Sequence, residues 1–414
     1  MGGAGKERAQ SRPGSPRLTP VPILRNIPRW ILRSGRDETE LHFPKITRPT
    51  ESPMKATQKL HDLGQSLWVD NISRQMLDEG LLEKYIREYS VTGLTSNPTI
   101  FDHAIAKSHR YDESIAEGLS RGLEGEALFF ELAMEDLRRA ADLFRPIYDE
   151  TKAVDGWVSL EVSPLLAYDG DRTLQEAKRI HGAMDRPNLL VKIPGTQEGL
   201  PAIAGSIADG VSVNVTLLFS AHHYSAAADG YMIGLERRKA AGLPLDAVSS
   251  VASVFISRWD KAIIGKVPAR LRNKLGIAVA KQAYRAYREI LASDRWRSLE
   301  EAGAKPQRLL WASTGTKDPQ ASDILYVRSL AAPQTINTLP EETLLAFADH
   351  GEIGELLPAD GGDAAAVLGE FRKAGVDPHA LAEQLQREGA DAFVASWKDL
   401  LRSLAERGTL LQRA

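Results

Sequence analysis

The sequence predicts an α/β protein in which parallel strands alternate with helices and close into a (β/α)8 barrel with additional helices. Three observations lead to this fold class. From about residue 57, short apolar runs alternate with longer stretches whose apolar residues recur every three or four positions. There are eight short runs, the number that closes such a barrel. Nearly every run also carries a polar residue near its carboxyl end, where barrels of this kind place their functional groups.

The eight short runs have the composition of buried strands. They are rich in Val, Ile, Leu and Trp, and Gly, Pro, Asn or Ser lie at many of their ends. In chain order the predicted strands are LWVDNI (67–72), GLTSN (93–97), WVSLEVSP (157–164), LLVKIPGT (189–196), VSVNVTLLF (211–219), SVASVFIS (250–257), RLLWAST (308–314) and TINTLP (335–340). An open, doubly wound sheet would produce the same alternation, so it remains the alternative fold.

The stretches between the strands have the apolar spacing of helices with one buried face. The clearest examples are 77–90, 124–144, 174–184, 270–293 and 391–412. Two segments are longer than a barrel requires. We expect a helical insertion at about 98–156, between the second and third strands, and a helical tail at about 341–414. The insertion and the tail would either cover the mouth of the barrel or form a subunit interface.

The composition excludes several classes of protein. The 414 residues include no Cys, which excludes a thiol nucleophile, a thiolate metal site and an iron–sulfur cluster. No apolar run is long enough to span a bilayer. A net charge of −3 argues against a dedicated nucleic-acid-binding protein. Of the nine His, only His222 and His223 are neighbours, and adjacent residues do not share a helix face, so the spacing of metal ligands is absent.

The first 53 residues differ from the rest of the chain. They carry ten Lys or Arg against five acidic residues and eight of the 22 prolines, whereas residues 54–414 have a net charge of −8. This composition predicts a disordered extension. Two alternatives remain open: translation begins at Met54 and the extension is spurious, or the Arg-rich segment is a targeting sequence. We expect residues 54–414 to form the barrel.

Polar residues near the ends of the predicted strands point to the function. A buried parallel strand normally consists of Val, Ile and Leu throughout, so these exceptions are informative. They are Asp70, Asn97, Glu161, Lys192, Asn214, Thr216, Ser253, Ser313 and Thr314. In a barrel the ends of the strands converge, and these side chains would meet on one face.

Lys192 follows the apolar residues LLV, so its amine would enter a mostly apolar barrel interior. An amine attacks a carbonyl only when it is unprotonated, a state that burial and neighbouring cations favour. Two acidic residues, Glu161 and Asp70, could serve the proton transfers that imine formation and carbon–carbon cleavage require. The alternatives are a Lys that snorkels at a strand end and a buried ion pair. The nearby Asn and Thr side chains would orient a sugar hydroxyl or an ordered water, or would cap the strand ends.

Three blocks of sequence resemble the transaldolase family, in the longer form found in some bacteria. GLTSNPTIF (93–101) is similar to the family's Thr-Ser-Asn-Pro-Thr signature, with Leu94 where Val or Ile is more usual. LLVKIPGTQEGLPAI (189–203) is similar to its Lys-bearing signature throughout. The segments LWVDNISR, VSLEVSP, VSVNVTLLFS and SVFISRWD then occur in the family's order. The resemblance covers about residues 57–345 and continues toward the C-terminus.

The resemblance implies a transaldolase of the pentose phosphate pathway that uses no cofactor. Such an enzyme reversibly transfers a dihydroxyacetone unit from sedoheptulose 7-phosphate to glyceraldehyde 3-phosphate, which gives erythrose 4-phosphate and fructose 6-phosphate. Its partners would be phosphorylated sugars, and we expect it to bind neither nucleic acid nor a membrane. We expect a cytoplasmic enzyme that is a monomer or a homodimer.

The resemblance also implies the catalytic roles. Lys192 would form the imine, or Schiff base, with the donor sugar. Asp70 would take the proton from the hydroxyl next to the bond that breaks. Glu161, together with Thr216, would hold and activate the water used in forming and hydrolysing the imine.

The same resemblance implies the residues that bind the substrate. Asn97 and Asn214 would bind the hydroxyls of the dihydroxyacetone unit, and Ser253 and Arg258 the distal end of the sugar phosphate. An Arg suits a phosphate because its planar fork makes two hydrogen bonds at once. Short members of the family carry a second Arg after the seventh strand, where this chain has WASTGTKDP. We expect Lys317, Ser313 or the backbone amides of Gly315 and Thr316 to bind the phosphate there.

Two other functions compete with transfer. A cleaving aldolase of the same superfamily would release dihydroxyacetone, but those relatives typically have Gln at the position of Glu161 and Tyr at the position of Phe255, so both residues favour transfer. A noncatalytic sugar-phosphate sensor could dispense with the amine, yet Lys192, Glu161 and Asp70 are all present.

Overall fold

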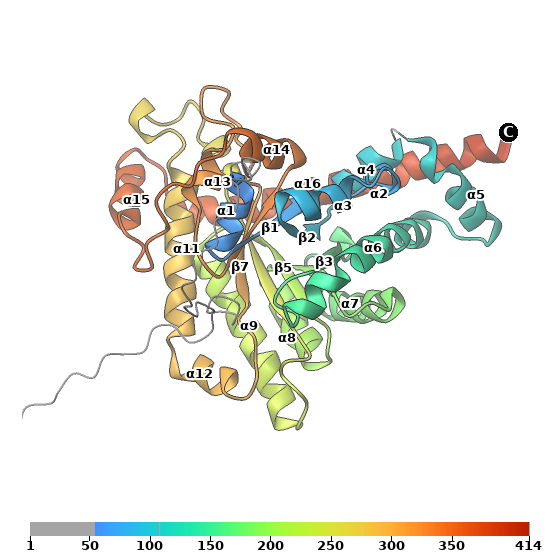
Figure 1. The fold of residues 1–414 in the computed structure, drawn as a ribbon, viewed down its shortest axis with the longest axis horizontal. Helices are drawn as coiled ribbons and strands as arrows, with labels where there is room; N and C mark the ends of the chain where they lie inside the picture. The colour runs from blue at the N-terminus through green and yellow to red at the C-terminus, as the bar shows by residue number, and fades with distance from the viewer. Residues whose placement is uncertain (1–53, 107, 414) are drawn as a thin grey trace, which may run out of the picture. The chain divides into compact units, whose positions relative to one another are not determined.

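Eight parallel strands form one closed barrel in the order β1 to β8 (Figure 1). The structure, a computed structural model, describes residues 54–106 and 108–413, and the predicted extension over residues 1–53 lies outside this part. The strands are β1 Gln65–Asp70, β2 Val91–Thr95, β3 Val158–Glu161, β4 Leu189–Pro194, β5 Val213–Leu218, β6 Ser250–Phe255, β7 Arg308–Ala312 and β8 Thr335–Leu339. The predicted barrel is confirmed. The doubly wound alternative is wrong, because β1 pairs in parallel with β8 and closes the sheet.

Helices separate successive strands and pack around the barrel (Figure 1). Those before β5 are α1 Ala56–Asp62, α2 Arg74–Asp78, α3 Leu81–Tyr89, α4 Pro98–Ala106, η1 His109–Tyr111, α5 Asp112–Ser120, α6 Gly125–Glu150, η2 Pro164–Leu166, α7 Gly170–Met184 and α8 Gly199–Ala208. Those after β5 are α9 Ala221–Ala240, α10 Ser257–Ala262, η3 Ala269–Leu271, α11 Leu275–Leu291, α12 Asp294–Glu300, α13 Leu325–Ser329, α14 Glu341–His350, α15 Ala364–Lys373 and α16 Pro378–Arg413.

The observed strands agree with the predicted ones in order and differ at their ends. The second strand ends at Thr95 and not at Asn97, because the Asn97 side-chain oxygen accepts the N–H of Ile100 at 3.1 Å and caps the start of α4. The third strand ends at Glu161 because the chain turns at Pro164 into η2. Glu161 is thus the last residue of its strand and Asn97 follows its strand by two positions, both on the mouth side of the barrel.

A polar cluster fills the barrel at the opposite end, near the starts of the strands. The Trp68 indole N–H and the Thr92 hydroxyl donate to the Asp155 carboxylate at 2.7 and 2.9 Å, and Ser66 also donates to it. The Trp68 ring lies so close to β2 that a Cβ on Gly93 would come within 2.5 Å of it. Gly93 is therefore needed for packing. Residues at this end of a barrel contribute to its stability and not to its chemistry.

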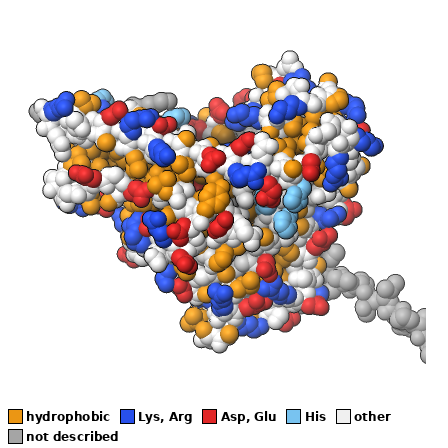
Figure 2. Space-filling model, turned by 180° about the vertical axis from the view of Figure 1, so that it is seen from behind, with side chains coloured by type: hydrophobic (Ala, Val, Ile, Leu, Met, Phe, Trp, Pro, Cys, Tyr) orange, Lys and Arg blue, Asp and Glu red, His pale blue; other side chains and the backbone are white. Residues whose placement is uncertain are grey.

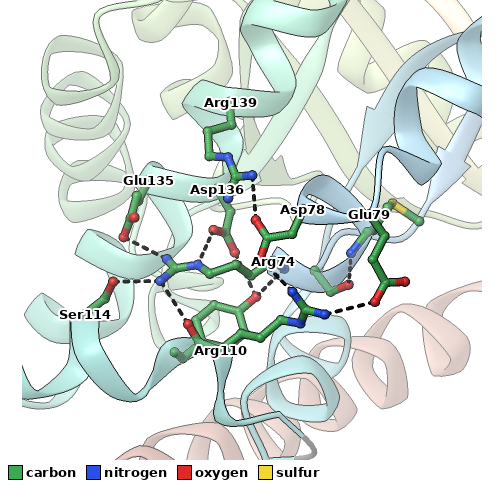
Figure 3. A network of polar contacts seen from close by, with 11 residues as sticks. Arg74, Asp78, Glu79, Arg110, Ser114, Glu135, Asp136 and Arg139 are labelled. Atoms are coloured by element: carbon green, nitrogen blue, oxygen red, sulfur yellow. Dashed lines mark hydrogen bonds and ion pairs between the residues drawn. The ribbon is translucent and has the colours of Figure 1, made fainter.

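The helices between β2 and β3 are joined to α2 by a buried polar network (Figure 3). Arg74 donates to the buried Asp136 at 3.0 Å, to the half-exposed Glu135 at 2.7 Å and to Ser114 at 2.6 Å. The Tyr111 hydroxyl donates to Asp136 at 2.7 Å. Since Asp136 is fully buried, the Arg74 guanidinium is its necessary counter-charge.

The tail after β8 contains α14, α15 and α16, and α16 covers the mouth of the barrel. This helix has 36 residues and begins well before the helical pattern at 391–412. It packs against α4, α5 and α6, and Figure 1 shows it running beside α4 toward α5. The Gln386 side chain donates to the carbonyls of Gly195 and Leu217, which follow the barrel strands or lie at their ends. These contacts hold this part of the tail over the mouth of the barrel.

Charged side chains of both signs are interspersed on the face shown in Figure 2. This mixture agrees with the nearly balanced composition of 52 basic and 55 acidic residues. Within residues 54–106 and 108–413, the helices are too short or too polar to cross a membrane.

Candidate active site

A pocket of about 150 Å³ opens at the carboxyl ends of the barrel strands, where barrels of this kind hold their functional groups. Most of the residues predicted from the sequence line it. Glu161 and Asn214 do not line the pocket themselves. Each contacts a residue that does, Glu161 the amine of Lys192 and Asn214 the hydroxyl of Ser253. The lining residues are Asp70, Thr95, Asn97, Lys192, Thr216, Ser253, Phe255, Arg258, Ala312, Ser313, Gly315, Lys317, Thr338, Pro340 and Phe393.

The register of the barrel brings the polar residues together. Parallel pairing places Lys192 beside Glu161 of β3 on one side and beside Asn214 of β5 on the other. The same pairing places Asp70 of β1 beside Thr95 of β2. Paired residues on neighbouring strands project to the same face of a sheet, so these side chains share the barrel interior.

The Lys192 amine is buried and has few polar neighbours. Its Nζ lies 3.1 Å from Glu161 Oε2 and donates to the carbonyl oxygen of Ser96 at 3.1 Å. The ring centroid of Phe393 is 5.4 Å away. An amine that touches one buried carboxylate and still lines a pocket is placed to meet a substrate carbonyl.

The Glu161 carboxyl is a buried acid with unused hydrogen-bonding capacity. Burial raises the pKa of Glu161, and the nearby charge of Lys192 only partly opposes that shift. Apart from the ion pair with Lys192, neither carboxylate oxygen has a hydrogen-bond partner among the described residues, and the same holds for the buried Thr216 hydroxyl. Buried polar atoms without partners are the atoms that hold an ordered water or a ligand.

Asp70 is held in place by a chain of hydroxyl groups. Thr95 Oγ1 donates to Asp70 Oδ1 at 2.8 Å and lies 2.6 Å from the hydroxyl oxygen of Thr338. Burial raises the pKa of Asp70, whereas the Lys192 charge and the Thr95 hydrogen bond lower it. A carboxyl with a raised pKa that faces a pocket is suited to exchange protons with a substrate.

Amide and hydroxyl groups line the pocket beside the amine. Ser253 Oγ donates to Asn214 Oδ1 at 2.7 Å, and Asn214 Nδ2 donates to Ser159 Oγ at 3.1 Å, so Asn214 is fixed from both sides. Asn97 uses its side-chain oxygen to cap α4 and presents its amide to the pocket. Such fixed donors can orient the hydroxyls of a polyol.

Two cationic side chains, Arg258 and Lys317, line the pocket together with Gly315. The Arg258 guanidinium lies over the Phe255 ring, 5.0 Å from its centroid, and burial lowers the pKa of Arg258. Ser313 adopts a left-handed conformation with φ 55°, which is strained for a residue with a side chain. Such strain often marks functional backbone, and two cations that line the same pocket can bind a phosphate.

Four polar or aromatic residues of the pocket or its cover were not identified from the sequence. Phe393 and Gln386 lie on α16, and the helical pattern of the tail does not reveal which surface its buried face meets. Thr95 is part of the GLTSN run, but its contact with Asp70 depends on the strand register. Thr338 lies on the last strand, which contains no acidic or amine side chain to indicate a site.

Metal ligands are not gathered in the part of the chain that the structure describes. Within it, no group of three or more His, Asp or Glu side chains is placed to hold an ion.

Comparison with known proteins identifies the family. The family model described as transaldolase/fructose-6-phosphate aldolase matches residues 67–404. A transaldolase of Saccharopolyspora erythraea is 46% identical over 356 residues, which are 84% of this chain and 97% of that protein. A transaldolase of Thermobifida fusca is 46% identical over 358 residues, with coverages of 84% and 97%. Transaldolase 2 of Streptomyces coelicolor is 44% identical over 356 residues, with coverages of 84% and 96%. The resemblance read from the sequence is thereby confirmed, and the chain belongs to the transaldolase/fructose-6-phosphate aldolase family.

Proposed function

We propose that the protein is a transaldolase that moves a dihydroxyacetone unit between phosphorylated sugars through an imine to Lys192. The single observation that carries this proposal is the buried Lys192 amine, 3.1 Å from Glu161, in a pocket that also contains the two cations Arg258 and Lys317. This arrangement suits a phosphorylated ketose, whose carbonyl would meet the amine while its phosphate met the cations. The acceptor and product sugars would be those of the pentose phosphate pathway.

The first half of the proposed reaction forms the imine. Lys192 attacks the ketone carbon as a neutral amine, which is possible when the shared proton resides on Glu161. The resulting carbinolamine loses its hydroxyl as water, and Glu161 supplies the proton. The partnerless oxygens of Glu161 and Thr216 support a water position at this point of the site.

The second half breaks and remakes a carbon–carbon bond. Asp70 takes the proton of the hydroxyl next to that bond, the bond's electrons move into the protonated imine, and an aldehyde leaves. The enamine that remains attacks the carbonyl of the acceptor aldose, and Asp70 returns the proton. Hydrolysis of the new imine then releases the product and restores Lys192. Thr95 would keep the Asp70 carboxylate oriented during both transfers.

Transfer is favoured over plain cleavage by the character of the pocket wall. Phe255 stacks on Phe219 with 5.3 Å between ring centroids and adds no hydroxyl that could hold a hydrolytic water. We further propose that the enzyme is cytoplasmic and is a monomer or a homodimer. Sedimentation of the purified protein would test the oligomeric state.

Trapping the imine is the test of the mechanism. Borohydride added with fructose 6-phosphate should attach a reduced dihydroxyacetone unit to the peptide that contains Lys192. Modification of another peptide, or of none, would refute the assignment. Lys192→Met should abolish both adduct and transfer. Lys317→Met is the matched control in the same pocket: its adduct should persist, while KM rises about 10- to 100-fold through the loss of one charge-assisted contact.

A coupled assay with and without erythrose 4-phosphate separates transfer from cleavage. Beyond one equivalent per active site, release of glyceraldehyde 3-phosphate should depend on the acceptor. Acceptor-independent turnover at a comparable rate would identify a cleaving aldolase instead. Glu161→Gln should slow formation and hydrolysis of the imine, so unchanged kinetics would contradict the role of Glu161.

A further inference from the structure

Helix α16 crosses the mouth of the barrel and is fixed on both sides of the pocket. On one side, Gln386 Nε2 donates to the carbonyl oxygens of Gly195 at 3.0 Å and Leu217 at 2.9 Å. On the other side, the Trp397 indole donates to Glu126 at 2.7 Å. The stretch between these contacts is therefore held against the site, and it contains Phe393.

Phe393 faces the catalytic amine directly. Its ring centroid lies 5.4 Å from Lys192 Nζ and 5.8 Å from the guanidinium carbon of Arg258, and the residue is only 6% exposed. Gly389, one turn earlier, suits this close approach: a Cβ there would lie 3.1 Å from Arg258 Nη1 and 3.0 Å from Leu217 Cδ2, so these side chains would have to shift slightly. The ring is thus an apolar wall between the imine position and the space above the barrel.

The proposed reaction makes such a wall useful. After the donor is cleaved, the enamine on Lys192 must survive until an acceptor aldose arrives. If it is protonated on carbon instead, the resulting imine adds one water molecule, and the carbinolamine collapses to free dihydroxyacetone and the Lys192 amine. A wall that keeps bulk water and its protons from the enamine slows this loss, while the water held by Glu161 and Thr216 stays available for hydrolysis of the new imine.

We propose that Phe393 is a specificity-determining residue that shields the enamine on Lys192 from bulk water and so favours transfer over release of dihydroxyacetone. The proposal rests on the imine mechanism proposed above. It assigns to the C-terminal helix a part in the outcome of the reaction, beyond the residues that the barrel strands supply.

The test measures the partition of the intermediate in the full-length enzyme. For each variant, the ratio of dihydroxyacetone released to dihydroxyacetone transferred is determined with fructose 6-phosphate and erythrose 4-phosphate, and the adduct is trapped by borohydride in parallel. Phe393→Ala should raise the ratio severalfold, and Phe393→Leu, which keeps an apolar wall, should restore most of the wild-type value. Leu400→Ala is the matched control, because Leu400 is a fully buried residue of α16 that does not line the pocket.

The outcomes separate the two proposals. A raised ratio in Phe393→Ala alone, with the adduct still on Lys192, supports the role of the ring. An unchanged ratio with a normal adduct overturns this inference and leaves the imine mechanism standing. An equal rise in Leu400→Ala also overturns it, because the docking of α16 in general would then control hydrolysis. A wild-type enzyme without an adduct on Lys192 overturns the mechanism on which the inference rests.

Discussion

Replacing Gln386 by Ala should release the middle of α16 from the barrel mouth. The side chain is 9% exposed, and its amide nitrogen donates to two carbonyls, at 3.0 Å to Gly195 and at 2.9 Å to Leu217. Without it, both carbonyls lose their donor from α16 while the helix is docked, whereas water solvates them when the helix is open. At about 1 to 3 kcal/mol for each unpaired group, the docked state loses about 2 to 6 kcal/mol.

Native-state hydrogen exchange measures this opening free energy directly. Because 1.4 kcal/mol corresponds to a factor of ten in an equilibrium constant, even the lower end of that range is a factor of about 30. The amides of residues 385–393 should therefore lose protection by at least about 30-fold in Gln386→Ala, while those of the barrel strands should change little.

Gln384 provides a control on the same helix. Its side chain is exposed and bonds only to Glu388, one turn away, at 2.7 Å. Gln384→Ala removes the same group without freeing any contact to the barrel, so protection over residues 385–393 should stay within about threefold of wild type. Equal protection in the two variants would refute the argument that Gln386 fixes the helix to the barrel.

Two further predictions concern stability. Asp136→Asn should lower the free energy of unfolding in urea by about 3 to 5 kcal/mol, because it removes the buried counter-charge of Arg74. The control Glu135→Gln removes a half-exposed partner of the same guanidinium and should lower it by at most about 1 kcal/mol. Equal losses in the two variants would contradict this reasoning. Burial lowers the pKa of His223, so the unfolded chain binds its proton more tightly, and the unfolding free energy should fall as the pH drops below about 6.5, by up to about 1.4 kcal/mol per pH unit. His223→Gln should remove that part of the slope, and an unchanged slope would show that other groups cause it.

The fold and much of the proposed site could be predicted because both depend on local patterns. Buried parallel strands require continuous apolar runs, so Lys192 in β4 and Glu161 in β3 were visible as exceptions to the pattern. The direction of parallel strands then places their carboxyl ends on one face. These two facts suffice to expect that the amine and the acid meet, and the register places them side by side at 3.1 Å.

Other parts of the site could not be predicted because they depend on exact register or on distant segments. The contact of Thr95 with Thr338 joins the second strand to the eighth, 243 positions apart, and requires the barrel to be closed. Which of the polar atoms would lack partners was also invisible in the sequence. Thr216 and Asn214 lie on the same strand, yet only the hydroxyl of Thr216 is without a hydrogen-bond partner among the described residues.

The sequence by itself therefore determined the barrel, the helical nature of the tail and the position of the amine and its acids. Only the tertiary structure decided that α16 covers the pocket, with Phe393 over Lys192 and with Gln386 bound to Gly195, 191 positions away. The physical reason is that the period of a helix specifies which face is buried but not the surface that it meets. That surface exists only after the eight strands have closed, and it is formed by the strand ends that also carry the catalytic groups.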